Sequence, residues 1–251
     1  MKASRLNEIE SLLEEQNTIS LDELCDKFGV SKNTIRRDIT ELEKRGSIKK
    51  VYGGIMRNQN SMPEPFFSRE IKNKLKKKQV AKLAASLIED NDVVYIDSGS
   101  TTMHIVPYLA NKKHLTILTA NVYVINEALQ YPQINVISTG GTLYRPSNAF
   151  VGANVIEFLK DYNISKALLA ATGISLKSGA TNAYPMEGDI KKYLIANSKT
   201  NILLVDSTKT DKISLVTFAQ LEDFDYIITD DDLSEKYKEY LKEHDVKLIT
   251  S

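Results

Sequence analysis

The sequence contains no tryptophan, one cysteine and three histidines among its 251 residues. The single thiol, Cys25, excludes an internal disulfide. His104, His114 and His244 show no metal-ligand spacing, and no apolar run approaches the roughly 20 residues of a membrane-spanning helix. The first residues are charged where a signal peptide would be apolar. We therefore expect a cytoplasmic protein without a metal site or a membrane partner.

Signatures of nucleotide binding are missing as well. The sequence has neither the glycine-rich dinucleotide fingerprint nor the P-loop pattern, so we predict no nucleotide cofactor. Net charge is zero, from 33 Lys and Arg against 33 Asp and Glu. It is unevenly placed, because residues 57–82 carry eight basic against two acidic residues and residues 83–251 carry fifteen against twenty-one. This layout indicates a basic middle, most simply a solvated linker and helix start, and an acidic body.

The first sixty residues have the pattern of a helix-turn-helix. Apolar residues recur at helical spacing over residues 3–16, which predicts an amphipathic helix. Ser20 and Glu23 form a capping box at the start of a second helix. Gly29 can end that helix in the left-handed conformation, and Ser31 can cap a third helix. Two short helices around a tight turn are typical of this motif.

The third helix, residues 31–45, has an outer face of DNA-reading side chains. Arginine can fork onto guanine and asparagine onto adenine, while lysine and threonine mostly hold phosphates. A short basic strand and a Gly-Gly turn after residue 46 predict a wing, and residues 31–53 carry seven basic against three acidic residues. Any surface helix carries some Lys and Arg, but the assembly favours DNA binding. The candidate DNA-binding residues are Ser31, Lys32, Asn33, Thr34, Arg36, Arg37, Thr40, Lys49, Lys50, Tyr52 and Gly53.

This half resembles the N-terminal signature of the DeoR family of bacterial transcription regulators. The matching stretches are VSKNTIRRDI (30–39), LE (42–43), Gly46 and VYGG (51–54). The resemblance implies a winged helix-turn-helix on operator DNA, which we assign to residues 1–57. Lys50 and Tyr52 stand where the family usually has arginine and histidine, which concerns the wing contacts and not the fold.

The rest of the chain alternates strands and helices after a linker, residues 58–71, that contains two prolines and shows no periodicity. Repeated units of this kind predict a Rossmann-like α/β domain over residues 72–251, with a parallel sheet covered on both faces. Predicted strands cover 93–97, 115–119, 134–138, 166–171, 202–206, 226–229 and 247–250, with helices beginning near 76, 101, 122 and 153 and covering 186–198 and 233–243.

Polar residues gather where five predicted strands end. Ligands bind parallel sheets beyond the carboxyl ends of the strands, and amides, hydroxyls and a helix dipole at residues 97–102 would favour a phosphate. A lysine at another strand end could add a positive charge. Tight turns use the same residue types, so for any single loop the alternative is turn chemistry alone. The five strand ends are 97–102, 119–121, 139–141, 172–173 and 206–209.

The body resembles the sensor domain of the DeoR family over nearly its whole length. The resemblance implies the fold of ribose 5-phosphate isomerase and glucosamine 6-phosphate deaminase, and a pocket for a phosphorylated sugar. The matching stretches are DSGSTT (97–102), GG (140–141), FVG (150–152), TGI (172–174), GATN (179–182), IKK (190–192) and DSTK (206–209). The candidate effector-binding residues are Asp97, Ser98, Gly99, Ser100, Thr101, Thr102, Asn121, Gly140, Gly141, Arg145, Glu187 and Lys209.

Two functions are open at this point. The first is a dimeric or tetrameric repressor of a sugar or polyol operon that a phosphorylated sugar intermediate releases from operator DNA. The DNA-binding half most resembles repressors of myo-inositol catabolism, in SLDELC (20–25), SKNT (31–34) and KVYGG (50–54). The alternative is a sugar-phosphate isomerase or deaminase that carries a DNA-binding domain. Asp97, Glu187 and Lys209 motivate it, because such groups can move protons if they converge.

Overall fold

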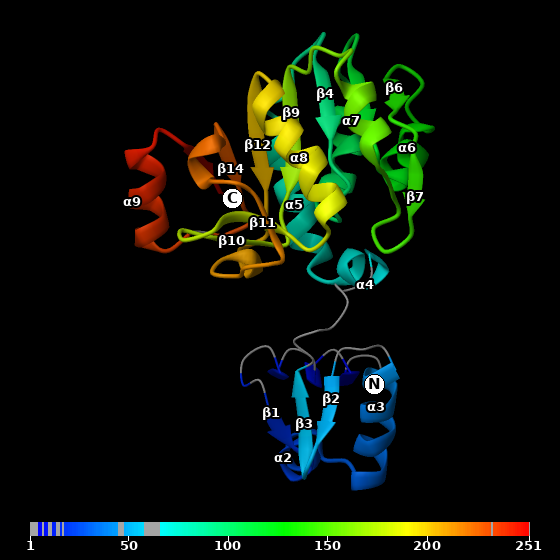
Figure 1. Cartoon of the computed structure of the whole chain (residues 1–251), viewed down its shortest axis with the longest axis vertical. Helices are drawn as coiled ribbons and strands as arrows, with labels where there is room; N and C mark the ends of the chain where they lie inside the picture. The colour runs from blue at the N-terminus through cyan, green and yellow to red at the C-terminus, as the bar shows by residue number, and fades with distance from the viewer. Residues whose placement is uncertain are drawn as a thin grey trace. The chain divides into compact units, whose positions relative to one another are not determined.

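The computed structural model describes residues 5–6, 8–9, 12–13, 16, 18–44, 48–57, 66–231 and 233–250. The chain divides into two compact units, Met1–Glu64 and Pro65–Ser251 (Figure 1). No helix among the described residues is long and apolar enough to cross a membrane.

The sequence predicts a linker over residues 58–71, but the structure has a helix in the C-terminal part of this range. Residues 58–65 lie outside the described residues, but 66–71 form a helix, α4 (Phe66–Ile71), of the second unit. Phe66 is buried and stacks on Tyr123 with the ring centroids 4.7 Å apart. The two prolines that precede this helix and its length of six residues concealed it, because so short a segment shows no helical periodicity.

The first unit is a winged helix. An antiparallel sheet in the order β1-β3-β2 packs with two helices, and the described residues between 5 and 16 are helical too. The elements are β1 (Thr18–Ser20), α2 (Leu21–Phe28), α3 (Lys32–Lys44), β2 (Ile48–Val51) and β3 (Gly54–Arg57). The buried core is Leu6, Ile9, Leu13, Ile19, Leu24, Ile35, Ile39, Leu42, Ile48 and Ile55.

Local capping explains where these helices begin and end. Ser20 Oγ accepts a hydrogen bond from the Glu23 amide at 3.1 Å, and the Glu23 carboxylate accepts one from the Ser20 amide at 2.8 Å. Gly29 ends α2 at φ +61°. Ser31 Oγ accepts from the Thr34 amide at 3.3 Å and so caps α3. The predicted capping box and helix ends are therefore confirmed.

The second unit is built on a parallel sheet of seven strands. The order is β15-β14-β12-β9-β4-β5-β6, and every neighbouring pair is parallel. The strands are β4 (Val93–Ile96), β5 (Thr116–Thr119), β6 (Asn135–Ser138), β9 (Lys166–Ala170), β12 (Thr200–Leu204), β14 (Tyr226–Ile228) and β15 (Lys247–Ile249). Each lies within about two residues of a strand predicted from the sequence.

Both faces of this sheet are buried, because successive side chains of a strand point to opposite faces. In β4, Tyr95 belongs to the core on one face, while Val94 and Ile96 belong to the core on the other. The first core takes residues from α7 (Ala153–Leu159), α8 (Pro185–Asn197) and α9 (Glu235–Glu243), and the second from α5 (Lys74–Ala85), η1 (Thr102–Leu109) and α6 (Val122–Ala128).

Two antiparallel pieces were missed by the sequence reading. One is the hairpin of β7 (Thr142–Tyr144) and β8 (Ala149–Val151), and the other a three-stranded sheet of β10 (Gly173–Ser175), β11 (Gly179–Asn182) and β13 (Val216–Ala219). Most of these strands mix apolar residues with Gly, Ser, Thr or Asn within three or four positions, so they show no apolar run like those of the parallel sheet. The helix predicted from residue 101 is a 3-10 helix, η1, which contains Pro107. Two further 3-10 turns are η2 (Ser207–Lys209) and η3 (Leu221–Asp223).

Candidate functional site

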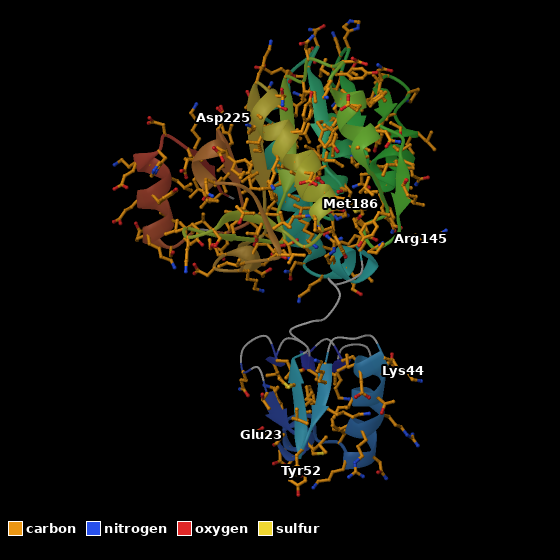
Figure 2. All side chains as sticks on the ribbon, in the orientation of Figure 1. Glu23, Lys44, Tyr52, Arg145, Met186 and Asp225 are labelled. Atoms are coloured by element: carbon orange, nitrogen blue, oxygen red, sulfur yellow. The ribbon has the colours of Figure 1, made fainter. Side chains whose placement is uncertain are left out.

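The candidate DNA-binding surface lies on α3 and the wing. Asn33, Arg36 and Arg37 are exposed on the face of α3 that is opposite its buried residues. Lys49 and Lys50 are exposed on β2, and Tyr52 is fully exposed in the β2–β3 turn. Figure 2 shows Lys44 and Tyr52 projecting from the helix and the turn. The structure therefore gathers the predicted basic residues on exposed parts of one unit.

Several of these residues already have partners within the unit. Lys32 Nζ lies 2.5 Å from an Asp22 carboxylate oxygen, and that hydrogen bond holds the pKa of Lys32 above its ordinary value. Lys50 Nζ lies 2.6 Å from a Glu43 carboxylate oxygen. Exposed ion pairs of this kind are weak, so a phosphate can displace the carboxylates.

Four of the predicted DNA-binding residues also stabilise the fold of the first unit. Ser31 and Thr34 cap α3, and their hydroxyl oxygens lie 3.1 Å apart. Thr40 Oγ1 donates to the Arg36 carbonyl at 2.8 Å. Gly53 turns the wing at φ +79°, a left-handed conformation that favours glycine. The hydroxyl side chains among them are therefore partly engaged within the unit, whereas Asn33, Arg36 and Arg37 are exposed.

In the second unit the candidate site lies where the strand order reverses. From β4 the chain continues to β5 and β6 on one side, and it later returns to β9 on the other side of β4. Ligands of open parallel sheets bind in the crevice at such a reversal, beyond the carboxyl ends of the strands. The loops that leave β4 and β9 there are residues 97–101 and 171–172.

A polar hollow occupies this crevice. Its empty space is about 420 Å³, with the open solvent at its mouth included. Three cationic side chains and one carboxylate line it. The amides of residues 98–101 donate to no other group in the described part of the chain, so the loop offers a row of donors to an anion. The lining residues are Arg69, Ser98, Gly99, Ser100, Thr101, Ala170, Ala171, Thr172, Asn182, Glu187, Lys191 and Lys209.

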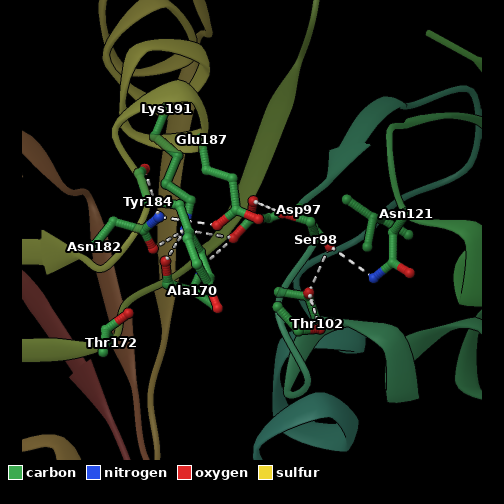
Figure 3. Close-up of polar contacts among 12 residues, drawn as sticks. Asp97, Ser98, Thr102, Asn121, Ala170, Thr172, Asn182, Tyr184, Glu187 and Lys191 are labelled. Carbon is green, nitrogen blue, oxygen red and sulfur yellow. Dashed lines mark hydrogen bonds and ion pairs between the residues drawn. The ribbon is translucent and has the colours of Figure 1, made fainter. Parts of the chain in front are cut away.

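An ion pair forms the floor of the crevice. Lys191 Nζ lies 2.9 Å from Asp97 Oδ2, and both side chains are less than 5% exposed. Lys191 also donates to the Ala170 carbonyl at 2.6 Å, and Asp97 accepts from the Ala170 amide at 2.9 Å (Figure 3). Gly99 lets the loop approach, because a Cβ there would lie 2.4 Å from the Ala170 Cβ. Burial and these bonds fix both charges in place.

A second buried lysine ties the loop to α4. Lys77 of α5 is 3% exposed, and its Nζ donates to Ser100 Oγ at 3.0 Å and to the Arg69 carbonyl. Arg69 lines the hollow as well. The loop after β4 and the first helix of the second unit are thus connected through one side chain.

The structure separates the predicted effector residues into three groups. Ser98, Gly99, Ser100, Thr101, Glu187 and Lys209 line the hollow, and Asp97 contacts it through Lys191. Two others hold the loop, since Thr102 Oγ1 and Asn121 Nδ2 donate to the Asp97 carbonyl at 2.7 and 3.3 Å. The last group does not line the hollow: Gly140, Gly141 and Arg145.

These last three have a different explanation. Gly140 and Gly141 turn the chain after β6 at φ +63° and +110°, and Arg145 is exposed in the β7–β8 turn (Figure 2). They follow β6, which lies two strands away from β4, where the strand order reverses. A position at the carboxyl end of a strand therefore does not by itself place a residue in the hollow.

Six lining residues were absent from the predicted set: Arg69, Ala170, Ala171, Thr172, Asn182 and Lys191. Arg69 was placed in the linker, and Asn182 and Lys191 were noticed only as parts of family-like stretches. A lysine inside a helix gives no sign that it is buried, so Lys191 was recognisable only from its apolar neighbours Ile190 and Leu194. No group of three or more His, Cys, Asp or Glu in the described segments could hold a metal ion.

A winged helix with an exposed basic helix, joined to a parallel-sheet domain with a polar crevice, defines a DNA-binding transcriptional regulator with a ligand-sensing body. Residues 5–61 match the model of the DeoR-like helix-turn-helix domain, and residues 72–231 match that of the DeoR C terminal sensor domain. The chain belongs to the DeoR family of transcriptional regulators.

Relatives with assigned names agree with this. The chain is 40% identical to the HTH-type transcriptional regulator IolR of Bacillus subtilis over 246 residues, which cover 98% of both chains. It is 29% identical to the HTH-type transcriptional repressor GlcR of the same organism, over 98% of this chain and 95% of that one. A solved structure of ribose 5-phosphate isomerase A from Methanocaldococcus jannaschii aligns over 55% of each chain at 19% identity and a TM-score of 0.41. The relatives are named as regulators, so the enzyme alternative is not favoured.

Proposed function

We propose that the protein represses a sugar or polyol operon in the bacterial cytoplasm, and that a small phosphorylated metabolite binds the hollow and releases the operator. The observation that carries the proposal is the hollow itself, with three cations and a loop whose amides donate to no group among the described residues, at the reversal of the strand order. The similarity to IolR supports a polyol pathway.

The phosphate would bind at residues 98–101. Successive amides and the hydroxyls of Ser98, Ser100 and Thr101 supply donors, and Lys209 and Arg69 supply positive charge at the same hollow. Charge-assisted hydrogen bonds of this kind are about twice as strong as neutral ones. The ion pair of Asp97 and Lys191 keeps the floor rigid, so the loop is in place before the ligand arrives.

Release of DNA requires that the ligand bind two conformations unequally. The contact of Lys77 with Ser100 and with the Arg69 carbonyl offers a route, because a phosphate at the loop would compete with these two acceptors for the Lys77 ammonium. The change would reach α4, the first helix after residues 58–65. We also propose a dimer or tetramer on a repeated operator, which light scattering of the free and DNA-bound protein tests.

The experiment is release of a fluorescent operator fragment from the full-length protein, titrated with phosphorylated and unphosphorylated sugars and polyols. Lys209→Ala should bind the operator as the wild type does and lose release at least tenfold. The matched control is Lys199→Ala, an exposed lysine just before the amino end of β12, the strand whose carboxyl end leads to Lys209. Normal release in Lys209→Ala, or release by unphosphorylated compounds alone, would refute the proposed site.

A further inference from the structure

Glu187 lies in the first turn of α8 with its carboxylate locked in one orientation. The side chain is buried, and Oε2 accepts a hydrogen bond from Asn182 Nδ2 at 2.9 Å. Asn182 is itself held, because Nδ2 also donates to the Tyr184 carbonyl at 3.2 Å and Oδ1 accepts from Lys191 Nζ at 3.1 Å. Figure 3 shows the Glu187 carboxylate beside this network.

The other carboxylate oxygen, Oε1, is buried without a hydrogen-bond partner among the described residues. A buried carboxylate oxygen that lacks a donor is costly, because water solvates it in the unfolded chain. Glu187 lines the same hollow as the loop of residues 98–101. A residue that lines the hollow therefore has a carboxylate oxygen without a donor among the described residues.

We propose that Glu187 Oε1 accepts a hydrogen bond from a hydroxyl group of the effector, and that this contact selects phosphorylated polyhydroxy compounds over other phosphate esters. The inference rests on the proposed function, since it concerns the same hollow. A hydroxyl fits better than an ammonium group, because Arg69 and Lys209 line the hollow beside the Lys191–Asp97 ion pair and outnumber the carboxylate of Glu187.

The test compares three probes on the full-length protein by isothermal titration: inorganic phosphate, hexyl phosphate and sorbitol 6-phosphate. The last two have the same chain length, but only sorbitol 6-phosphate carries hydroxyls. In the wild type sorbitol 6-phosphate should bind at least about tenfold more tightly than hexyl phosphate, as expected for one hydrogen bond to a charged group.

In Glu187→Ala this ratio should fall about tenfold, while the affinity for inorganic phosphate stays within about twofold. Glu187→Gln keeps the side-chain volume and can keep its oxygen on Asn182, but its hydrogen bond to a hydroxyl would be a neutral one, so the ratio should fall there by less than in Glu187→Ala. The control is Asp189→Asn, an exposed carboxylate on the same helix, which should not change the ratio. Operator binding by each variant confirms its fold.

The outcomes separate the two proposals. If hexyl phosphate and inorganic phosphate bind but sorbitol 6-phosphate gains nothing, or if its gain survives in both Glu187 variants, this inference is overturned and the phosphate site stands. If none of the three binds, the proposed function fails and the inference with it.

Discussion

The candidate binding surfaces of the two units use charged side chains in opposite ways. In the first unit the basic residues of α3 and the wing are exposed, and their carboxylate partners, such as Asp22 for Lys32, are exposed too. In the second unit Asp97, Lys77 and Lys191 are buried. Asp97 and Lys191 form an ion pair, and Lys77 donates to Ser100. A surface that must contact DNA keeps its charges available, whereas a site that must distinguish small molecules fixes its charges before binding.

Among the variants that test this difference, Lys191→Met should have the largest effect. It leaves the buried carboxylate of Asp97 without its ion pair, which should cost about 3–5 kcal/mol of the free energy of unfolding of the second unit. Urea unfolding followed by circular dichroism measures it, with the exposed Lys192→Met as the control. Asp97→Asn combined with Lys191→Met should recover part of the loss. A loss under about 1 kcal/mol would break the comparison.

Arg37→Ala should act in the opposite manner, on binding and not on folding. If Arg37 forks onto a guanine, its loss should weaken operator binding by about 1–3 kcal/mol. The melting temperature should stay the same, because the side chain is exposed. Fluorescence anisotropy with operator DNA measures the affinity. Lys242→Ala, an exposed lysine of the second unit, controls for the lost charge, and equal affinity of Arg37→Ala and wild type would remove Arg37 from the DNA readout.

Ser20→Ala should have a smaller effect, confined to the first unit. It removes the side-chain acceptor for the Glu23 amide and one half of the capping box, which typically costs about 1 kcal/mol of helix stability. Thermal unfolding should show the first unit melting at a lower temperature with the second unit unchanged. Ser20→Asp, which restores an acceptor at the same position, should recover the loss. Failure to recover it would mean that the serine acts in some other way.

The smallest expected effect on stability near neutral pH comes from His104. This histidine tests the second unit alone, because the first unit contains no histidine. Burial, with Lys74, Lys78 and Lys77 nearby, lowers the pKa of His104 from 6.5 to about 4. The unfolded chain therefore binds this proton at a higher pH than the folded chain, so stability falls as the pH is lowered from about 6.5 towards 4. Melting curves of wild type and His104→Gln across this range should diverge in acid. Parallel curves would contradict the lowered pKa.

The sequence contained enough to predict the elements that depend on local signals. The capping residues Ser20 and Glu23 marked a helix, and strand-length apolar runs marked the seven strands of the sheet. It could not show which strand ends meet, because the neighbour relation of β4 and β9 depends on how the chain returns across the sheet. For that reason Gly140 and Gly141 were included with the site, whereas Lys191 was omitted because a lysine inside a helix gives no sign that it is buried.

The position of Arg69 on α4 has a consequence for how the sensor can be cut from the chain. The family's sensor model begins at residue 72, three residues after Arg69. A fragment that starts there would lack the Arg69 cation at the hollow and the Arg69 carbonyl that accepts a hydrogen bond from Lys77. It would also lack the Phe66 ring that stacks on Tyr123. Truncation at residue 72 would therefore remove part of the hollow's lining together with the DNA-binding unit, and a sensor fragment should start no later than residue 65.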